Sequence, residues 1–176
     1  YAVIEGVMEY DGDEDAGIRC WEAGHAGYNA NSYSSTSRWS NSLAAAVEPD
    51  VAFVALGLND FAASATFSPT AFKANLANIV TKIRAANPEC LIAVVNSYER
   101  GDVTSPTHPW EAYVTAMAEL VAGDDKAVLI DTNGRLLGWN LVDPEYRTVW
   151  DADKIHVSPA GHGVIANAVL GTLDRP

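Results

Sequence analysis

The stretch Val51-Ala52-Phe53-Val54-Ala55-Leu56-Gly57-Leu58-Asn59-Asp60 decides the fold expected for this chain. Its first six residues are all apolar and show no polar alternation. Such a run is typical of a strand that helices cover on both faces, as in a parallel sheet. Gly57 follows the run, and the polar residues Asn59 and Asp60 come just after it. The sequence therefore predicts an internal strand over 51–56 with polar side chains at its carboxyl end.

Further apolar runs alternate with helical patterns along the rest of the chain. Leu91–Val95 and Val128–Ile130 are short apolar segments of the kind that form buried strands. Ser68-Pro69 and Ser158-Pro159 each place a capping serine directly before a proline, which is a typical helix start, and Pro109 opens a third helical pattern. This alternation favours an α/β fold with a parallel sheet.

The composition is that of one folded domain. A chain of 176 residues with 48% apolar residues can bury a single sizeable core. The formal net charge of −12 argues against binding to nucleic acid or to an anionic membrane, and no apolar run approaches the ~18 residues that span a bilayer. Cys20 and Cys90 fit a disulfide or two free thiols, so they leave the compartment, including secretion, open.

Three polar segments are expected at one edge of the sheet. The turn Gly24–Gly27 follows a strand candidate over Ile18–Trp21, Asn59 follows the strand 51–56, and Asp153 and His156 lie in a loop before the last helix. In open α/β sheets, ligands bind outside the carboxyl ends of the strands. We therefore expect these segments to form a site together.

Asp153 and His156 are the main candidates for proton transfer. Histidine titrates near neutrality, and a carboxylate bonded to its Nδ1 fixes the tautomer and stabilises the imidazolium that forms. Because the two residues are three positions apart in a loop, the aspartate can fold back onto the ring. Two alternatives stay open: Asp151 is a second partner at another spacing, and Asp153 can instead accept backbone N–H bonds near the helix start.

Asn59 and Gly27 are candidates for stabilising negative charge. A side-chain amide can donate a hydrogen bond to a developing oxyanion, and a glycine lets a backbone N–H approach the same atom. Each residue also has a local alternative, because asparagine and glycine are both common in turns.

The motifs resemble, in order, the conserved blocks of the SGNH/GDSL hydrolases, a family of serine esterases and lipases. Glu22–Gly27 loosely matches the family's Asn-x-Gly-x-x-Gly block, with Glu22 in place of the asparagine. Gly57–Asp60 matches Gly-x-Asn-Asp, and Asp153–His156 matches Asp-x-x-His, followed by Pro159 and by Gly161-His162. The resemblance extends from about residue 18 to residue 173.

The resemblance implies a role for each matching residue. The Gly27 backbone N–H and the Asn59 side-chain amide would form the oxyanion hole. His156 would be the general base, oriented by Asp153. His162 would cap or pack the final helix, and His25 is expected to be exposed beside the site. The family needs no metal or other cofactor.

The family's nucleophile is absent from this chain. It lies in a Gly-Asp-Ser motif after the first strand, and no Gly-Asp-Ser occurs here. Ser97 ends a strand, but not the one that carries the family's nucleophile. We therefore expect residues 1–176 to form a single, N-terminally incomplete domain, a flavodoxin-like three-layer α/β/α sandwich with a parallel sheet that lacks its first strand. A further segment or chain would carry that strand and its serine.

The expected activity is hydrolysis of small acyl esters by a serine esterase. Carbohydrate O-acetyl groups are a candidate substrate, suggested by the family and by Trp139 and Trp150 in the late loop. A non-catalytic binding or structural module is the alternative that the missing serine favours, whereas Asn59, Asp153 and His156 favour the enzyme. A metal hydrolase using the four histidines is disfavoured because no metal-ligand spacing such as HExxH occurs.

Overall fold

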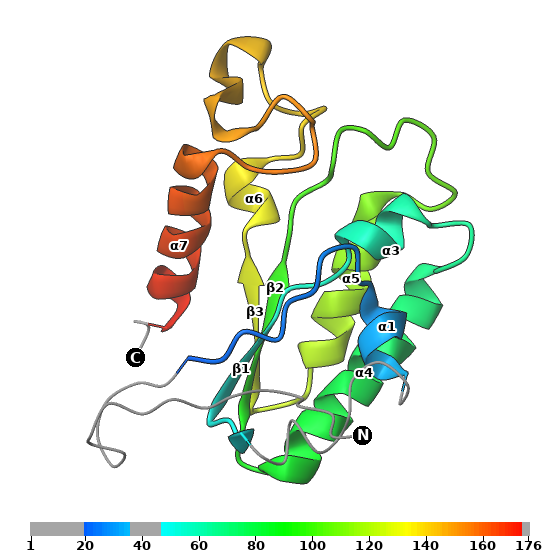
Figure 1. Cartoon of the computed structure of the whole chain (residues 1–176), viewed down its shortest axis with the longest axis vertical. Coiled ribbons are helices and arrows are strands. Elements are labelled where there is room, and N and C mark those ends of the chain that lie inside the picture. Colours follow the sequence, from blue (N-terminus) through cyan, green and yellow to red (C-terminus); the bar gives the residue numbers. More distant parts are fainter. Residues whose placement is uncertain (1–19, 36–46, 174–176) are drawn as a thin grey trace, which may run out of the picture.

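The computed structural model describes residues 20–35 and 47–173 (Figure 1). Within these residues, three strands form the sheet, and helices connect and flank them. The elements in chain order are α1 (Ala30–Ser34), β1 (Val51–Val54), α3 (Leu58–Ala62), α4 (Pro69–Ala86), β2 (Leu91–Asn96), α5 (Trp110–Val121), β3 (Ala127–Asp131), α6 (Asn133–Leu136), the 3-10 helix η1 (Pro144–Val149) and α7 (Pro159–Leu173).

The sheet is parallel, with the strand order β1-β2-β3. Val51 pairs with Leu91 at the start of β1, and Asn96 pairs with Asp131 at the end of β3. The α/β class and the parallel sheet predicted from the sequence are therefore confirmed. The strand expected over 51–56 is shorter and ends at Val54.

Alternate side chains of β2 contribute to two different apolar clusters. Ile92 and Val94 belong to the larger cluster with buried residues of α4 and α5, whereas Ala93 and Val95 pack with Ala168 of α7. This division follows from the two-residue period of a strand, which sends successive side chains to opposite faces. Helices thus lie on both sides of the sheet, with α4 and α5 on one side and α7 on the other (Figure 1).

The helix starts agree with the capping signals in the sequence. The Ser68 hydroxyl accepts a hydrogen bond from the Ala71 N–H at 3.3 Å, and Pro69 is the first residue of α4. Pro109 is the residue that precedes α5, and α7 begins at Pro159 as expected. None of the helices in the described part of the chain is long and apolar enough to cross a membrane.

One expectation about the N-terminal part is not met in the residues that the structure describes. Cys20 and Trp21 lie outside any strand, and the remainder of the strand expected over Ile18–Trp21 lies outside the described residues. Cys20 is exposed and Cys90 is buried, and both are free thiols.

Candidate active site

A glycine turn places Asn59 in a short helix. The sequence predicts a position directly at the strand end, and the structure differs on this point. Gly57 precedes α3 with φ 121°, a conformation that side-chain-bearing residues rarely adopt. A Cβ at Gly57 would also lie 3.2 Å from the Trp110 ring and 3.3 Å from the Met117 side chain. The chain turns here because only glycine fits, and Asn59 therefore lies in the first turn of α3.

Phe61 anchors α3 in the core. It is fully buried, and its ring meets Trp110 edge-on at a centroid distance of 5.4 Å and Tyr113 at 5.9 Å. Edge-to-face aromatic pairs of this kind add stability beyond the apolar area they bury. Asn59 thus lies on a helix that the Phe61 side chain fixes against Trp110 and Tyr113 of α5.

The Asn59 carboxamide has a defined orientation. Its Nδ2 donates to the Tyr28 carbonyl oxygen at 2.8 Å, and its Oδ1 accepts from Nη1 of Arg100 at 3.3 Å. The amide has a second N–H, for which no acceptor is found among residues 20–35 and 47–173. Asn59 lines a cavity of about 190 Å³ together with His25, Tyr28 and Leu56. The free N–H is therefore available to a ligand in this region.

The Gly24–Gly27 turn lies across the cavity from α3. Tyr28 N–H donates to the His25 carbonyl oxygen at 3.2 Å, and Gly27 between them has φ 77°, which suits the third position of a type II turn. Tyr33 holds the turn, because its hydroxyl accepts from the His25 N–H at 3.0 Å and donates to the Ala23 carbonyl oxygen at 2.9 Å. The His25 side chain is exposed, as expected from the sequence.

Asp60 ties the start of α1 to α3. Both carboxylate oxygens accept from the Ala30 N–H, at 3.2 and 3.1 Å. The residue is fully buried, and none of the ion pairs within the described residues includes it. Burial disfavours the charged form and raises the pKa of Asp60 to about 6, although the Ala30 N–H opposes this shift.

The chain is expected to gain stability from Asp60 as the pH falls. Because the pKa is higher in the folded state than its ordinary value of 3.8, folding favours the protonated form, and stability increases as the pH decreases from about 7 through 6 and on toward 3.8. At pH 5 the gain relative to pH 7.5 is about 1.4 kcal/mol, or roughly 3–5 °C in Tm. Thermal unfolding of the wild type and of Asp60→Asn measures it. Equal pH dependence in both proteins would contradict the assignment.

A closed loop carries Asp153 and His156. Trp150 and Val157 form an antiparallel bridge at its base, and the Asp151 N–H donates to the His156 carbonyl oxygen at 3.0 Å. Lys154 lies at the tip with φ 64°, in the left-handed region. The loop therefore reverses direction within a few residues and brings the Asp153 side chain back toward His156.

The Asp153 carboxylate fulfils both roles that the sequence left open. Oδ2 lies 2.5 Å from Nδ1 of His156, while Oδ1 accepts from the backbone N–H groups of Ile155 and His156, each at 2.9 Å. The hydrogen bond from the His156 backbone N–H, followed by the one from its ring, lowers the pKa of Asp153 to about 2. Asp153 is therefore a carboxylate near neutral pH, and among the described residues the His156 ring is hydrogen-bonded to Asp153 and not to the Asp151 carboxylate.

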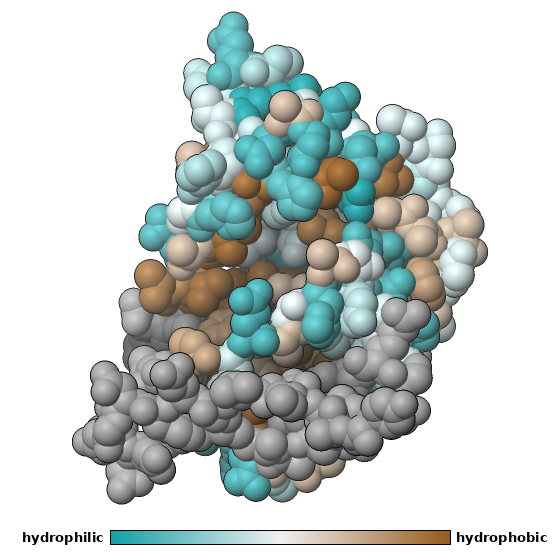
Figure 2. Space-filling model, viewed as in Figure 1, coloured by the Kyte–Doolittle hydropathy of each residue, from teal (hydrophilic) through white to brown (hydrophobic). Residues whose placement is uncertain are grey.

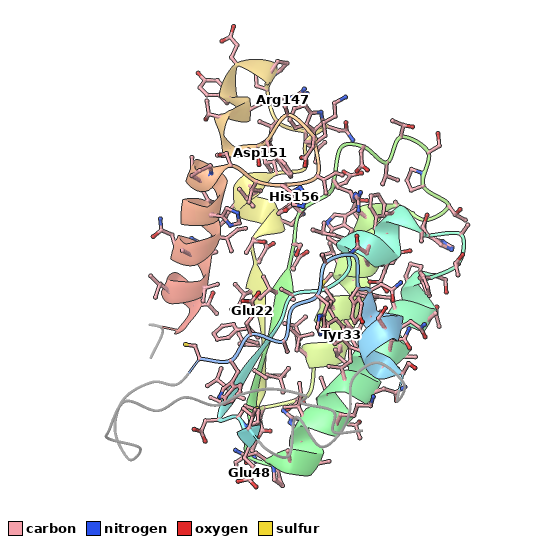
Figure 3. All side chains as sticks on the ribbon, in the orientation of Figure 1. Glu22, Tyr33, Glu48, Arg147, Asp151 and His156 are labelled. Atoms are coloured by element: carbon pink, nitrogen blue, oxygen red, sulfur yellow. The ribbon has the colours of Figure 1, made fainter. Side chains whose placement is uncertain are left out.

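The loop exposes the histidine to solvent. The His156 side chain is 70% exposed and that of Asp153 is 44% exposed. Figure 3 shows Asp151 and His156 beyond the carboxyl ends of the strands, at the end of the molecule opposite to Glu48. With Nδ1 occupied by Asp153, the Nε2 atom of His156 is the nitrogen left for a reacting group.

The segment after β2 connects the two halves of the site. Arg100 contacts Asn59, and the next residue, Gly101, donates its N–H to the Lys154 carbonyl oxygen at 2.7 Å. Leu58, the neighbour of Asn59, packs against a cluster that contains Trp150 and Val157. Asn59 and the Asp153–His156 pair thus lie in one connected region.

The expectation for His162 needs correction. His162 is exposed and does not pack; Gly161 provides the close contact in that pair instead, because a Cβ there would lie 2.3 Å from the Val149 carbonyl oxygen. Trp139 and Trp150 of the late loop pack edge-on, with ring centroids 6.1 Å apart, which is the common arrangement for tryptophans. Within residues 20–35 and 47–173, no group of three or more His, Cys, Asp or Glu side chains could hold a metal ion.

Comparison with known proteins identifies the family. The family model described as GDSL-like Lipase/Acylhydrolase matches residues 11–164, most of the chain. The chain belongs to the GDSL-like lipase/acylhydrolase family. The resemblance seen in the sequence is thereby confirmed for this SGNH protein. No curated protein matches it significantly.

Solved structures with the same fold include several carbohydrate esterases. A carbohydrate esterase family 3 protein from Talaromyces cellulolyticus is 19% identical, with a TM-score of 0.65 over 85% of this chain and 68% of its own. A family 3 carbohydrate esterase from Clostridium thermocellum is 21% identical, with a TM-score of 0.63 over 85% and 67%. A mutant of an acetyl-xylooligosaccharide esterase from Geobacillus is 18% identical, with a TM-score of 0.62 over 85% and 69%. At these identities the likeness shows a shared fold.

Proposed function

We propose that this chain supplies the general base and the oxyanion hole of a serine esterase for small acyl esters, and that a segment outside the chain supplies the nucleophile. One observation carries the proposal: Oδ2 of Asp153 contacts Nδ1 of His156, and the rest of the imidazole is exposed. A carboxylate in this position fixes the tautomer that leaves Nε2 free to accept a proton. Membership of the acylhydrolase family supports the same chemistry.

The reaction would proceed through an acyl-enzyme. The serine oxygen attacks the ester carbonyl carbon while Nε2 of His156 takes the serine proton. The carbonyl oxygen becomes an oxyanion that accepts hydrogen bonds from Asn59 Nδ2 and the Gly27 N–H. When this intermediate collapses, the C–O bond to the alcohol breaks, and the alcohol leaves with the proton from His156. Water then attacks the acyl-serine, His156 takes its proton, and the acid is released with the serine restored.

The exposed side of β1 supports the docking of a nucleophile-bearing segment. In the described part of the chain, β1 pairs with β2 alone. Val51 and Phe53 are 42% and 50% exposed, and Leu91 and Val128, on the same face, are exposed as well. Figure 2 shows apolar surface beside α7, on the side of the sheet where these residues lie. A parallel strand followed by a helix would pair with β1 and cover this face, ending next to the cavity at Asn59.

Carbohydrate O-acetyl groups are the substrates that we propose first. Three solved structures with the same fold are described as carbohydrate or acetyl-xylooligosaccharide esterases. The cavity beside Asn59, about 190 Å³, is small enough to suit a short acyl group. Release of acetate from acetylated xylan oligosaccharides, compared with longer-chain p-nitrophenyl esters, would test this preference.

A non-catalytic binding module is the second candidate. It is favoured by one observation: no serine hydroxyl contacts the His156 ring within residues 20–35 and 47–173. The hydroxyl proton of the nearby Ser158 is already used, because it is donated to the Thr148 carbonyl oxygen at 2.7 Å.

Labelling with a fluorophosphonate, followed by intact mass measurement of every polypeptide present, distinguishes these functions. The probe phosphonylates an activated serine and releases fluoride. We expect the label on a co-purifying segment that carries a Gly-Asp-Ser-like serine. A label on a serine of this chain would place the nucleophile here and contradict the proposed segment. A complete, folded sample that takes no label would establish the binding module as the better explanation.

A further inference from the structure

Arg100 lies beneath the oxyanion side of the site and is 8% exposed. Its guanidinium is held from one side by Asp102: Nε donates to Oδ1 at 2.6 Å, and Nη2 donates to Oδ2 at 2.7 Å. This paired geometry fixes the plane of the guanidinium. The third nitrogen, Nη1, is then directed at α3, where it donates to the Leu58 carbonyl oxygen at 3.4 Å and to Asn59 Oδ1 at 3.3 Å.

The contacts of Arg100 leave it little capacity to bind a substrate. A guanidinium has five N–H donors and no acceptor, and four of these donors have partners here. Because the group is also almost fully buried, a substrate carboxylate or hydroxyl would have to displace Asp102 or Asn59 to reach it. Arg100 therefore acts on the site through the residues that it holds.

The partners of Asn59 determine which way its amide faces. Arg100 can only donate, so the Asn59 atom next to it must be the oxygen; the Tyr28 carbonyl can only accept, so the atom next to it must be the nitrogen. A flipped amide would place Oδ1 of Asn59 against the Tyr28 carbonyl oxygen, which are two acceptors, and Nδ2 against Nη1 of Arg100, which are two donors. One N–H of Nδ2 is used by Tyr28, and the other has no acceptor within residues 20–35 and 47–173.

We propose that Arg100 is a positioning residue that holds the Asn59 carboxamide so that its second N–H donates to the oxyanion. The positive charge at Oδ1 also polarises the amide and makes its N–H groups stronger donors. Through the neighbouring Gly101 N–H, which donates to the Lys154 carbonyl oxygen, the same segment holds the loop with Asp153 and His156. Arg100–Gly101 thereby sets the spacing between the oxyanion donor and the base. The inference rests on the proposed esterase function.

The first test observes Asn59 directly and needs no catalysis. The two side-chain N–H resonances of Asn59 are recorded by NMR in the wild-type chain and in Arg100→Met. We expect both to shift and broaden in the variant, because the amide loses the partner of its oxygen. Arg84→Met is the matched control: it removes another paired arginine–aspartate contact, with Asp124, and is expected to leave Asn59 unchanged. Unchanged Asn59 resonances in folded Arg100→Met would overturn the inference.

The second test is a double-mutant cycle in the assembled esterase. Arg100→Met should lower kcat about tenfold or more with little change in KM, as expected when an oxyanion donor is misdirected. In an Asn59→Ala background, the same substitution should lower kcat less than about threefold, because the group it positions is gone. Equal effects in both backgrounds would overturn the inference.

A second variant covers the case in which Arg100→Met does not fold. Arg100→Lys keeps the charge and the contact with Asp102, but an ammonium group cannot hold Asp102 and Asn59 at the same time, so its kcat should also fall. Full activity of Arg100→Lys would contradict a role for the guanidinium in holding Asp102 and Asn59 at the same time. If the wild-type assembly itself shows no esterase activity, the proposed function fails, and the Asn59 resonances decide the role of Arg100 separately.

Discussion

His156→Gln is expected to lower kcat for ester hydrolysis by about 10⁴ in the assembled esterase, with little change in KM. Glutamine has nearly the size of histidine but cannot accept and return a proton near neutral pH. The loss should therefore fall on the chemical step and not on substrate binding. Because the His156 side chain is 70% exposed, the melting temperature should change little.

His162→Gln provides the matched control for this substitution. His162 lies six residues further on, in the first turns of α7, and its side chain is exposed. The His162→Gln variant should retain the wild-type kcat. The rate of fluorophosphonate labelling should fall in His156→Gln and not in His162→Gln. If His156→Gln kept more than a tenth of the wild-type kcat, another group would have to be the base.

The sequence predicted the strands and helix starts well because these depend on local patterns. The continuous apolar run at Leu91–Val95 is part of β2, and the serine-proline pair at Ser68-Pro69 begins α4. The end of β1 was predicted less accurately. The run stays apolar through Leu56, but the backbone at Gly57 turns with φ 121° against Trp110, and that packing involves residues more than fifty positions away.

The candidate site was predictable only where its residues lie close together in the chain. Asp153 and His156 could be paired from their spacing, yet the sequence could not decide between a ring contact and backbone contacts, because one carboxylate makes both. Arg100 was missed altogether. It contacts Asn59 from 41 positions away, and nothing in its sequence neighbourhood distinguishes it from an ordinary surface arginine. Only the fold brings the end of β2 next to α3.

Gly161→Ala is expected to cause the largest loss of stability among the changes considered. A Cβ at this position would lie 2.3 Å from the Val149 carbonyl oxygen and 2.6 Å from the Val157 Cβ, much closer than real contacts allow. The added methyl group must push the backbone apart, at a cost of about 3 kcal/mol. For a chain of this size, the melting temperature should fall by roughly 6–12 °C.

Gly163→Ala separates this steric effect from the effect of removing a glycine. It lies in the same helix, two residues further on, and a Cβ there would meet nothing within 4 Å. Alanine is the better helix former by up to about 1 kcal/mol, so this variant should melt at the same temperature as the wild type or slightly higher. Equal melting temperatures for the two variants would contradict the predicted clash.

The clash at Gly161 should also reach the candidate site. The Val149 carbonyl oxygen accepts the Ser158 N–H at 3.0 Å, and Trp150 and Val157 form the base of the loop that carries Asp153 and His156. Displacing Val149 therefore opens the base of this loop, and hydrogen exchange at the Asp151 and Ser158 N–H groups should accelerate in Gly161→Ala but not in Gly163→Ala. Gly161 thus supports the position of the loop that carries Asp153 and His156, which explains in physical terms why a glycine stands directly before His162 in this chain.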